Sequence, residues 1–135
     1  MKFAHIALAA AMTVAGFAGT AEAASDKAMK KCRACHSWES GKKGKQGPNL
    51  FAIMGATAGT NAKFKYNKKS VLPGAGAKGL VWDETNLDEY LQDPTKFLRK
   101  FLGDKKAKSK MTFKLKGAKN AKHRKAIIEF LAGNK

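Results

Sequence analysis

The sequence Cys-Arg-Ala-Cys-His at residues 32–36 constrains this chain more than any other feature, because it contains both of its cysteines. Two residues separate the thiols, and a histidine follows the second directly. Four chemistries use thiols in this way: a structural disulfide, a dithiol redox centre, a metal site, or covalent attachment of haem. The surrounding sequence distinguishes them.

The first three chemistries each lack something that they need. A disulfide between Cys32 and Cys35 would close a loop too short to stabilise the fold much. A dithiol redox centre is expected after a strand in a βαβ unit, and no strand pattern precedes Cys32. A zinc site needs four ligands, but the chain has no second cysteine pair and only His36 and His123 beyond its N-terminal segment.

Covalent haem attachment uses every residue of the motif. In Cys-x-x-Cys-His the two thiols add to the haem vinyl groups and the histidine ligates iron. Residues three and four apart share one face of a helix, so both sulfurs and the imidazole can meet one porphyrin. We therefore predict one haem c, attached through Cys32 and Cys35, with His36 as an axial ligand.

Residues 1–23 have the three parts of a secretory signal. Lys2 is followed by an alanine-rich apolar stretch that ends in Ala-Glu-Ala, as at a signal cleavage site. The alternative is an uncleaved membrane anchor, but the apolar run is short and His5 interrupts it. We expect an exported, periplasmic protein with one domain at 24–135 and no membrane insertion after cleavage.

The chain is strongly basic, with 27 Lys and Arg against 10 Asp and Glu and a net charge of +17. Loss of residues 1–23 removes one residue of each sign, Lys2 and Glu22, so the charge stays the same. Such a charge favours acidic partners. An exported protein rarely meets nucleic acid, so we expect none as partner. A generally solvated lysine surface is the plainer alternative.

Periodicity and capping residues predict an all-α domain. One helix is expected from Ser25 through Cys35, and a second opens at Asp83 with apolar residues at helical spacing. A third follows Asp93 and ends at Gly103, and the last runs over 120–132. Residues 55–79 hold five glycines without periodicity. We expect omega-type loops there that pack on the haem.

Met111 is the predicted sixth ligand of the iron. It lies in the lysine-rich segment KSKMTFK, far from His36 in sequence and free to reach the opposite haem face. Met29 shares a helix with His36 and cannot cross the haem, and Met54 is expected to pack in a short helix. A thioether paired with an imidazole favours ferrous iron and raises the potential.

His123 is the rival sixth ligand. It lies in the last helix among Lys122, Arg124 and Lys125, which we interpret as a solvated face. Met111 is therefore preferred.

These motifs together resemble the class I cytochromes c, in particular the bacterial soluble c-two group. The resemblance covers nearly all of residues 25–133 and rests on CRACH, GPNLF at 47–51, DEYLQDPTKF and KSKMTF in that order. It implies a fold of short helices and omega loops wrapped round one covalently bound haem. The segment FLGDKKAKSK before Met111 resembles the longer insertion of the c-two group.

The resemblance also implies roles for individual residues. The carbonyl of Pro48 would accept a hydrogen bond from the ligating histidine, and Tyr66 and Trp82 would bind a haem propionate. Tyr90 would lie near the methionine sulfur. The remaining positions are a haem-packing leucine, a small hydroxyl residue and an aromatic that shields the haem edge: Leu91, Ser109 and Phe113.

Two positions depart from the family pattern. Ala28 stands where a phenylalanine commonly packs on the last helix, so that contact is either thinner or filled by Met29. Ala56 stands where an arginine often lies near a propionate.

The function implied is that of an electron-transport protein and not an enzyme. It would be a monomeric one-electron carrier cycling between Fe(III) and Fe(II), taking electrons from a membrane cytochrome bc-type complex to a terminal oxidase, reaction centre or reductase, in respiration or photosynthesis. Its contacts with acidic faces of these complexes would be transient. Four lysines are expected to contact these partners: Lys31, Lys45, Lys106 and Lys110.

Two other functions compete with the carrier. A small haem peroxidase or gas-binding haem protein would need an open sixth site, which Met111 argues against. A basic binding module without haem would leave CRACH unexplained.

Overall fold

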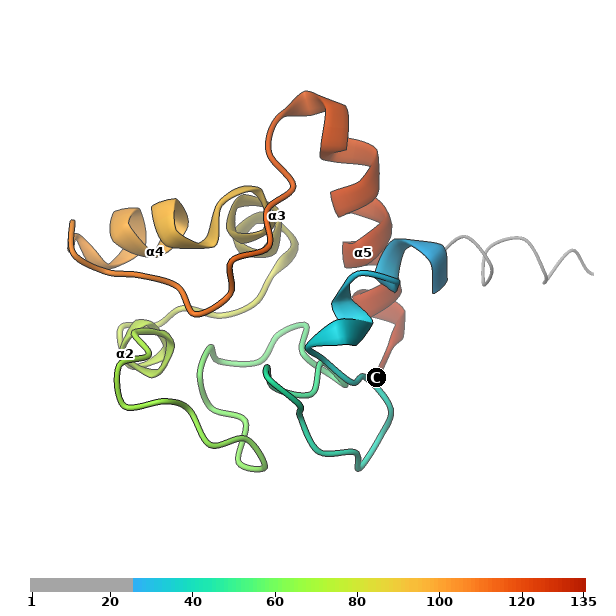
Figure 1. Ribbon diagram of the computed structural model, residues 1–135, viewed down its shortest axis with the longest axis horizontal. Coiled ribbons are helices and arrows are strands. Elements are labelled where there is room, and N and C mark those ends of the chain that lie inside the picture. The colour runs from blue at the N-terminus through green and yellow to red at the C-terminus, as the bar shows by residue number, and fades with distance from the viewer. Residues whose placement is uncertain (1–25) are drawn as a thin grey trace, which may run out of the picture.

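The computed structural model describes residues 26–135, and these residues are helical and looped without any extended sheet (Figure 1). The only strand-like pairing described in this range is one isolated bridge between Thr57 and Val81. The predicted signal segment, 1–23, and the predicted cap at Ser25 lie outside the described residues. The elements are the 3₁₀ turns η1 (Cys32–Ala34) and η2 (Ala118–Asn120) and the helices α2 (Leu72–Ala77), α3 (Glu84–Gln92), α4 (Pro94–Leu102) and α5 (Ala121–Gly133).

The first helix is shorter than predicted. Residues 26–29 are α-helical, and after a turn the chain enters η1, so no continuous helix reaches Cys35. The carbonyl of Cys32 accepts hydrogen bonds from the N–H groups of both Cys35, at 3.1 Å, and His36, at 2.9 Å. A 3₁₀ turn commonly tightens a helix end in this way, and here it gathers the three motif residues on one turn.

Capping residues define α3 and α4 as the sequence predicts. The Asp83 side chain accepts from the N–H of Asn86 at the start of α3, and the Asp93 side chain accepts from Lys96 at the start of α4. Gly103 ends α4 in the left-handed conformation at φ 65°, which glycine adopts without steric cost. Both predicted helices are confirmed.

Helix α2 was not predicted, because its sequence LPGAGA carries poor helix formers. Pro73 lies in its first turn, where a missing N–H costs nothing. Gly76 faces the loop at Ala58, and a Cβ atom at this position would collide with the Ala58 carbonyl oxygen. The helix therefore forms by close packing against the loop rather than by intrinsic propensity.

Helix α3 lies at the centre of the helical part and packs against α4 on one side and α5 on the other, while α2 packs against α4. The loops between η1 and α2 run below these helices in Figure 1, and the segment 103–117 returns from α4 to α5 in front of α3. The core between the elements includes Leu80, Leu98 and Ile127, each at most 1% exposed. No helix of residues 26–135 is long and apolar enough to cross a membrane.

The contact between the first helix and the core is filled by Met29, which is fully buried beside Ala28. One expectation about α5 is wrong. His123 is half-buried, and its Nε2 lies 2.9 Å from the carbonyl oxygen of Ala28. Arg124 is 5% exposed, so this side of α5 is no solvated face. Lys122 and Lys125 alone are exposed there as predicted.

Candidate haem-attachment site

Both cysteines are free and half-buried on the tight turn η1. Cys32 packs against the apolar core, and this burial raises the pKa of its thiol. The Sγ of Cys35 lies 3.5 Å from the side-chain oxygen of Gln46 in the following loop. The thiols are thus not joined to each other, and both are available for thioether bonds.

The imidazole of His36 is held by one hydrogen bond. Its Nδ1 lies 2.7 Å from the carbonyl oxygen of Pro48, and because a carbonyl only accepts, Nδ1 carries the proton. Nε2 is therefore left with its lone pair, as metal ligation requires. Burial lowers the pKa of His36, while the bond to Pro48 acts in the opposite direction. The neutral ligand form is favoured.

Gly47 is a site residue that the sequence reasoning missed. A Cβ atom there would collide with the Cε1, Nδ1 and Nε2 atoms of the His36 ring. The Gly47 N–H donates to the carbonyl of Cys35 at 2.8 Å, which fixes the loop under the imidazole. The position directly before Pro48 in GPNLF was the available signal.

Met111 lies in the segment between α4 and α5, partly buried against the same core as Cys32. Its N–H donates to the Ser109 hydroxyl at 3.1 Å, and that hydroxyl lies 3.2 Å from the Tyr90 hydroxyl. Burial raises the pKa of the Tyr90 phenol, so the phenol stays protonated and can donate. These contacts fix the backbone that carries the thioether.

The predicted aromatic residues fall into two groups. Trp82 and Tyr90 are buried and pack edge to face with centroids 4.8 Å apart, next to the buried Leu91. Tyr66 lies in the loops, half-buried, with its ring against Phe64 at 4.9 Å and its hydroxyl accepting from the Asn61 N–H at 3.4 Å. The propionate roles of Tyr66 and Trp82 stay predictions.

The attachment turn and the Met111 segment face each other. The Lys31 ammonium lies 6.0 Å from the centre of the Phe113 ring, which is itself partly buried against the core. By contrast, Met29 is enclosed in the core and His123 is engaged with Ala28. Met54 is partly buried against the same core.

These residues fit haem c. One turn presents two free thiols and an imidazole with Nε2 unengaged, and a thioether borders the same apolar cluster from a distant segment. Thioether bonds and imidazole–methionine ligation need this donor set. No three His, Cys, Asp or Glu side chains within 26–135 gather as a metal-binding group, whereas a zinc site needs four ligands.

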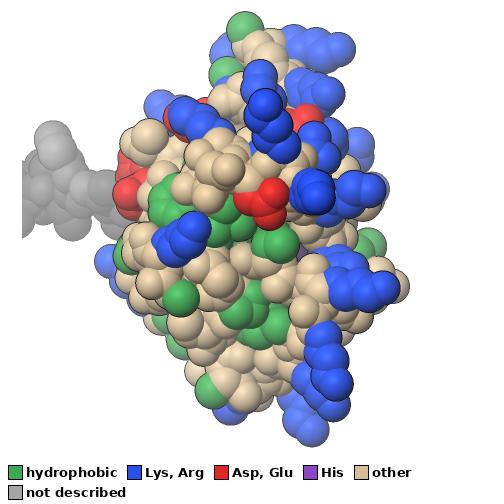
Figure 2. All heavy atoms as spheres, turned by 90° about the vertical axis from the view of Figure 1, so that its left-hand side faces the viewer, with side chains coloured by type: hydrophobic (Ala, Val, Ile, Leu, Met, Phe, Trp, Pro, Cys, Tyr) green, Lys and Arg blue, Asp and Glu red, His purple; other side chains and the backbone are tan. Residues whose placement is uncertain are grey.

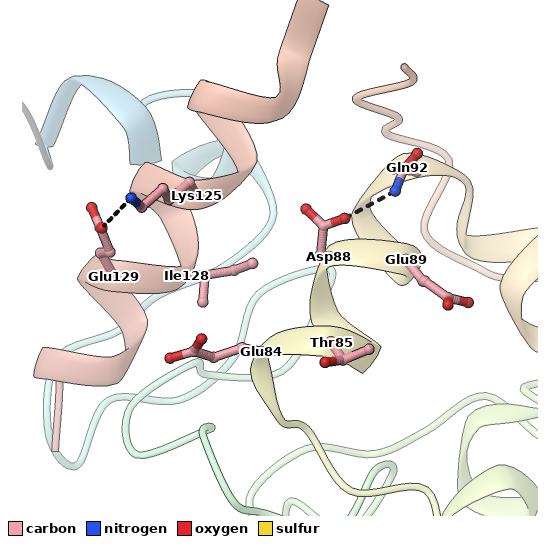
Figure 3. A pocket seen from close by; sticks show the side chains of 8 residues that line it. All are labelled: Glu84, Thr85, Asp88, Glu89, Gln92, Lys125, Ile128 and Glu129. Atoms are coloured by element: carbon pink, nitrogen blue, oxygen red, sulfur yellow. Dashed lines mark hydrogen bonds and ion pairs between the residues drawn. The ribbon is translucent and has the colours of Figure 1, made fainter. Parts of the chain in front are cut away.

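A separate cleft of ≈630 Å³ lies between α3 and α5, and none of these residues lines it (Figure 3). Its acidic side chains are mostly paired. Glu129 meets Lys125 at 3.7 Å, and Asp88 accepts from Gln92 at 2.9 Å. The cleft is an exposed groove between two packed helices and contains no predicted site residue.

Comparison with known proteins identifies relatives of this chain. No family model matches the chain. A cytochrome c2 of Cereibacter sphaeroides is 51% identical over 86 residues, which are 64% of this chain and 68% of that protein. The chain belongs to the cytochrome c2 family. A cytochrome c-551 of Roseobacter denitrificans is 53% identical over 70 residues, which are 52% of this chain and 48% of that protein.

Solved cytochrome c2 structures share the fold. The crystal structure of cytochrome c2 from Rhodobacter sphaeroides has a TM-score of 0.68 at 43% identity and covers 83% of this chain and 94% of its own. The structure of cytochrome c2 from Rhodospirillum centenum has a TM-score of 0.75 at 35% identity and covers 84% of this chain and 97% of its own. The predicted class I cytochrome c fold is confirmed. This cytochrome c2 homologue is an electron carrier and not an enzyme, with one covalent haem c.

Proposed function

We propose that this chain is a soluble periplasmic carrier that takes single electrons from a membrane cytochrome bc-type complex. It delivers them to a terminal oxidase, a reaction centre or a reductase. Export by the predicted signal at residues 1–23 supports the location, and the family supports the task. Its encounters with these complexes are transient, and it works as a monomer.

The proposed ligand set is His36 and Met111, with thioether bonds at Cys32 and Cys35. The observation that carries it is the hydrogen bond from Nδ1 of His36 to Pro48, because it leaves Nε2 with its lone pair on a residue next to two free thiols. The backbone bond of Met111 to Ser109 supports the second ligand.

Haem, when bound, supplies the one-electron chemistry of its iron. The chain's residues would hold the two proposed ligands in place in either oxidation state of the iron. Pro48 orients the imidazole, and Tyr90 with Ser109 holds the backbone at Met111. The buried residues Trp82 and Leu91 keep water away from the apolar side of the site. Ligands that do not rearrange suit a carrier that must give up its electron quickly.

The docking lysines have different surroundings. The Lys45 ammonium donates to the carbonyl of Arg33 at 2.7 Å, and Lys31 lies over Phe113. These two charges are therefore held beside the attachment turn. Lys106 and Lys110 are exposed in the segment that leads to Met111. Two of the proposed docking charges thus lie beside the attachment turn and two in the segment before Met111.

Figure 2 shows the side of the molecule that carries α2 and α4 in Figure 1. Lys and Arg side chains border much of this face, apolar patches lie between them, and acidic side chains are few. Basic side chains beside apolar patches suit brief docking on an acidic partner, since such charges act mainly on the encounter rate.

Optical spectra of the reduced protein with and without carbon monoxide test this function. A carrier with Met111 on the iron gives the same spectrum in both conditions. A carbon monoxide adduct that forms readily would show an open sixth site, and the protein would then be a gas-binding or peroxidase-type haem protein.

A further inference from the structure

The segment 103–117, which carries Met111, forms no helix or strand of its own. Its main-chain groups are bonded to main-chain and side-chain groups of the neighbouring helices instead. The N–H of Ser109 donates to the Thr95 hydroxyl at 3.2 Å, and the N–H of Leu115 donates to the carbonyl of Leu91 at 2.8 Å. The position of Met111 therefore depends on groups outside its own segment.

Arg124 of α5 binds this segment on the C-terminal side of Met111. Its Nη1 donates to the carbonyl oxygens of Leu115, at 2.8 Å, and Gly117, at 2.9 Å. Its Nε donates to Asp88 of α3 at 2.7 Å. At 5% exposure Arg124 is a buried charged residue, and these bonds compensate its burial.

Arg99 of α4 binds the segment on the N-terminal side. Its Nε donates to the carbonyl oxygen of Ala107 at 2.9 Å. Ala107 is 1% exposed although charged residues surround it in sequence, so the chain is folded tightly back on α4 here. Arg99 itself is exposed, and its bond is the weaker of the two. Ala107 and Leu115 stand equally far from Met111 along the chain.

We propose that Arg124 and Arg99 are positioning residues for Met111. From opposite ends they fasten the segment that carries the thioether, Arg124 to α5 and α3 and Arg99 to α4. The proposal rests on Met111 as the proposed sixth ligand. A thioether is a neutral ligand that leaves the iron whenever its segment opens locally, and such opening is controlled by hydrogen bonds of this kind.

Lysine cannot replace either arginine in this task. A guanidinium offers donors in a fixed planar fork, whereas an ammonium is a single point of charge on a flexible stem. Arg124→Lys keeps the charge near Asp88 but leaves the buried Leu115 carbonyl and the partly buried Gly117 carbonyl poorly paired. A buried acceptor without its partner favours the opened segment.

Imidazole titration of the ferric holoprotein tests the proposal. Imidazole competes with Met111 for the iron, so its apparent affinity rises with the fraction of opened protein. We expect Arg124→Lys to raise this affinity on the order of 10-fold. For Arg99→Lys, whose bond is only partly buried and whose side chain is exposed, we expect a rise of roughly 3-fold. Loss of the methionine-to-iron charge-transfer band reports the exchange.

Ile127→Val is the matched control. Ile127 is 1% exposed on α5 and belongs to the core, but it makes no side-chain hydrogen bond to the Met111 segment. We expect this variant to lower the thermal midpoint while its imidazole affinity stays at the wild-type value. A role of Arg124 in stability alone would give the same pattern for Arg124→Lys, and that result would overturn the proposal.

Two further outcomes are decisive. If the wild-type protein lacks the methionine band, the ligand assignment itself is wrong and the positioning role falls with it. If Arg124→Lys does not fold, the imidazole affinities of Arg99→Lys and Asp88→Asn test the proposal instead. Asp88→Asn removes the negative charge that accepts the hydrogen bond from Nε of Arg124. Unchanged imidazole affinity in both variants would refute the positioning role while the band still upheld Met111 as ligand.

Discussion

At the scale of single residues, Gly47 shows how little space His36, the proposed axial histidine, has. The imidazole of His36 occupies the place that a side chain at residue 47 would need, and the bond to Pro48 prevents the ring from moving aside. The loop and the ligand are therefore shaped for each other, and the smallest possible substitution at this position tests that fit.

We expect Gly47→Ala to cost about 1–3 kcal/mol of folding free energy, as overpacking does, and to shift the ferric spectrum as the imidazole is displaced. Gly74→Ala is the matched control, because no atom lies within 4 Å of its Cβ position in α2. It should be stabilising by roughly 0.5–1 kcal/mol. Chemical denaturation measures both. Equal stability of the two variants with unchanged spectra would contradict the account.

The proposed ligands and attachment thiols could be chosen from sequence motifs alone, whereas the buried positions of Arg124 and His123 could not be predicted. The attachment motif has a fixed spacing, so Cys32, Cys35 and His36 needed no knowledge of the fold. A charged residue in a basic stretch is usually exposed. Arg124 is buried because Asp88 and two distant carbonyls meet it, and such partners appear only once the helices are packed.

At the scale of elements, Asp93 joins three parts of the molecule. Its carboxylate caps α4 through the N–H of Lys96 and pairs with Lys114 at 2.9 Å and Lys116 at 3.6 Å beyond Met111. The hydrogen bond from Lys114 lowers the pKa of Asp93 below its ordinary value of 3.8. The folded protein thus binds a proton at Asp93 less readily than the unfolded chain does.

The stabilisation from Asp93 is therefore fully present above the ordinary pKa and is lost as the pH falls through the folded-state value. Asn caps helices as well as Asp does but carries no charge. We expect Asp93→Asn to lose stability near neutral pH and to show a shallower decline than wild type as the pH falls below about 4. Urea denaturation across this range measures it. Parallel pH profiles for the two proteins would count against the ion pairs.

Helix capping could be predicted, and the packing of glycine-rich segments could not. Asp83, Asp93 and Gly103 define their helix ends locally, by side chains and conformations within a few residues. In contrast, α2 depends on the approach of Gly76 to Ala58, a contact between distant parts of the chain. The tightening at η1 was also not predicted, although it is local: two N–H groups share the carbonyl of Cys32.

At the scale of the whole molecule, the effect of the net charge of +17 on electron transfer should depend on where the lysines lie on the surface. We expect Lys→Glu at Lys31, Lys45, Lys106 and Lys110 to slow bimolecular electron transfer to an acidic partner. Salt screens these charges, with a Debye length of about 10 Å at 0.1 M. The transfer rate of the variants should therefore depend less on salt concentration than the wild-type rate does. Stopped-flow rates against ionic strength measure the effect for each variant.

On α5, Lys122→Glu is a better control for this series than Lys125→Glu. Lys125 pairs with Glu129 at 3.7 Å, so a glutamate there would also create a repulsive pair. Lys122 is exposed, and no ion pair involves it among the described residues. If Lys122→Glu slows transfer as much as the docking variants do, the charge serves solubility and the docking face is wrong.

The central claim is that this cytochrome c2 homologue ligates its haem iron through His36 and Met111, and the ferric absorption spectrum of Met111→Ala tests it most directly. We predict that the methionine-to-iron charge-transfer band is present in the wild type and in the control Met54→Leu. In Met111→Ala the band should vanish, the potential should fall, and the reduced protein should bind carbon monoxide. A band that persists in Met111→Ala would contradict the account.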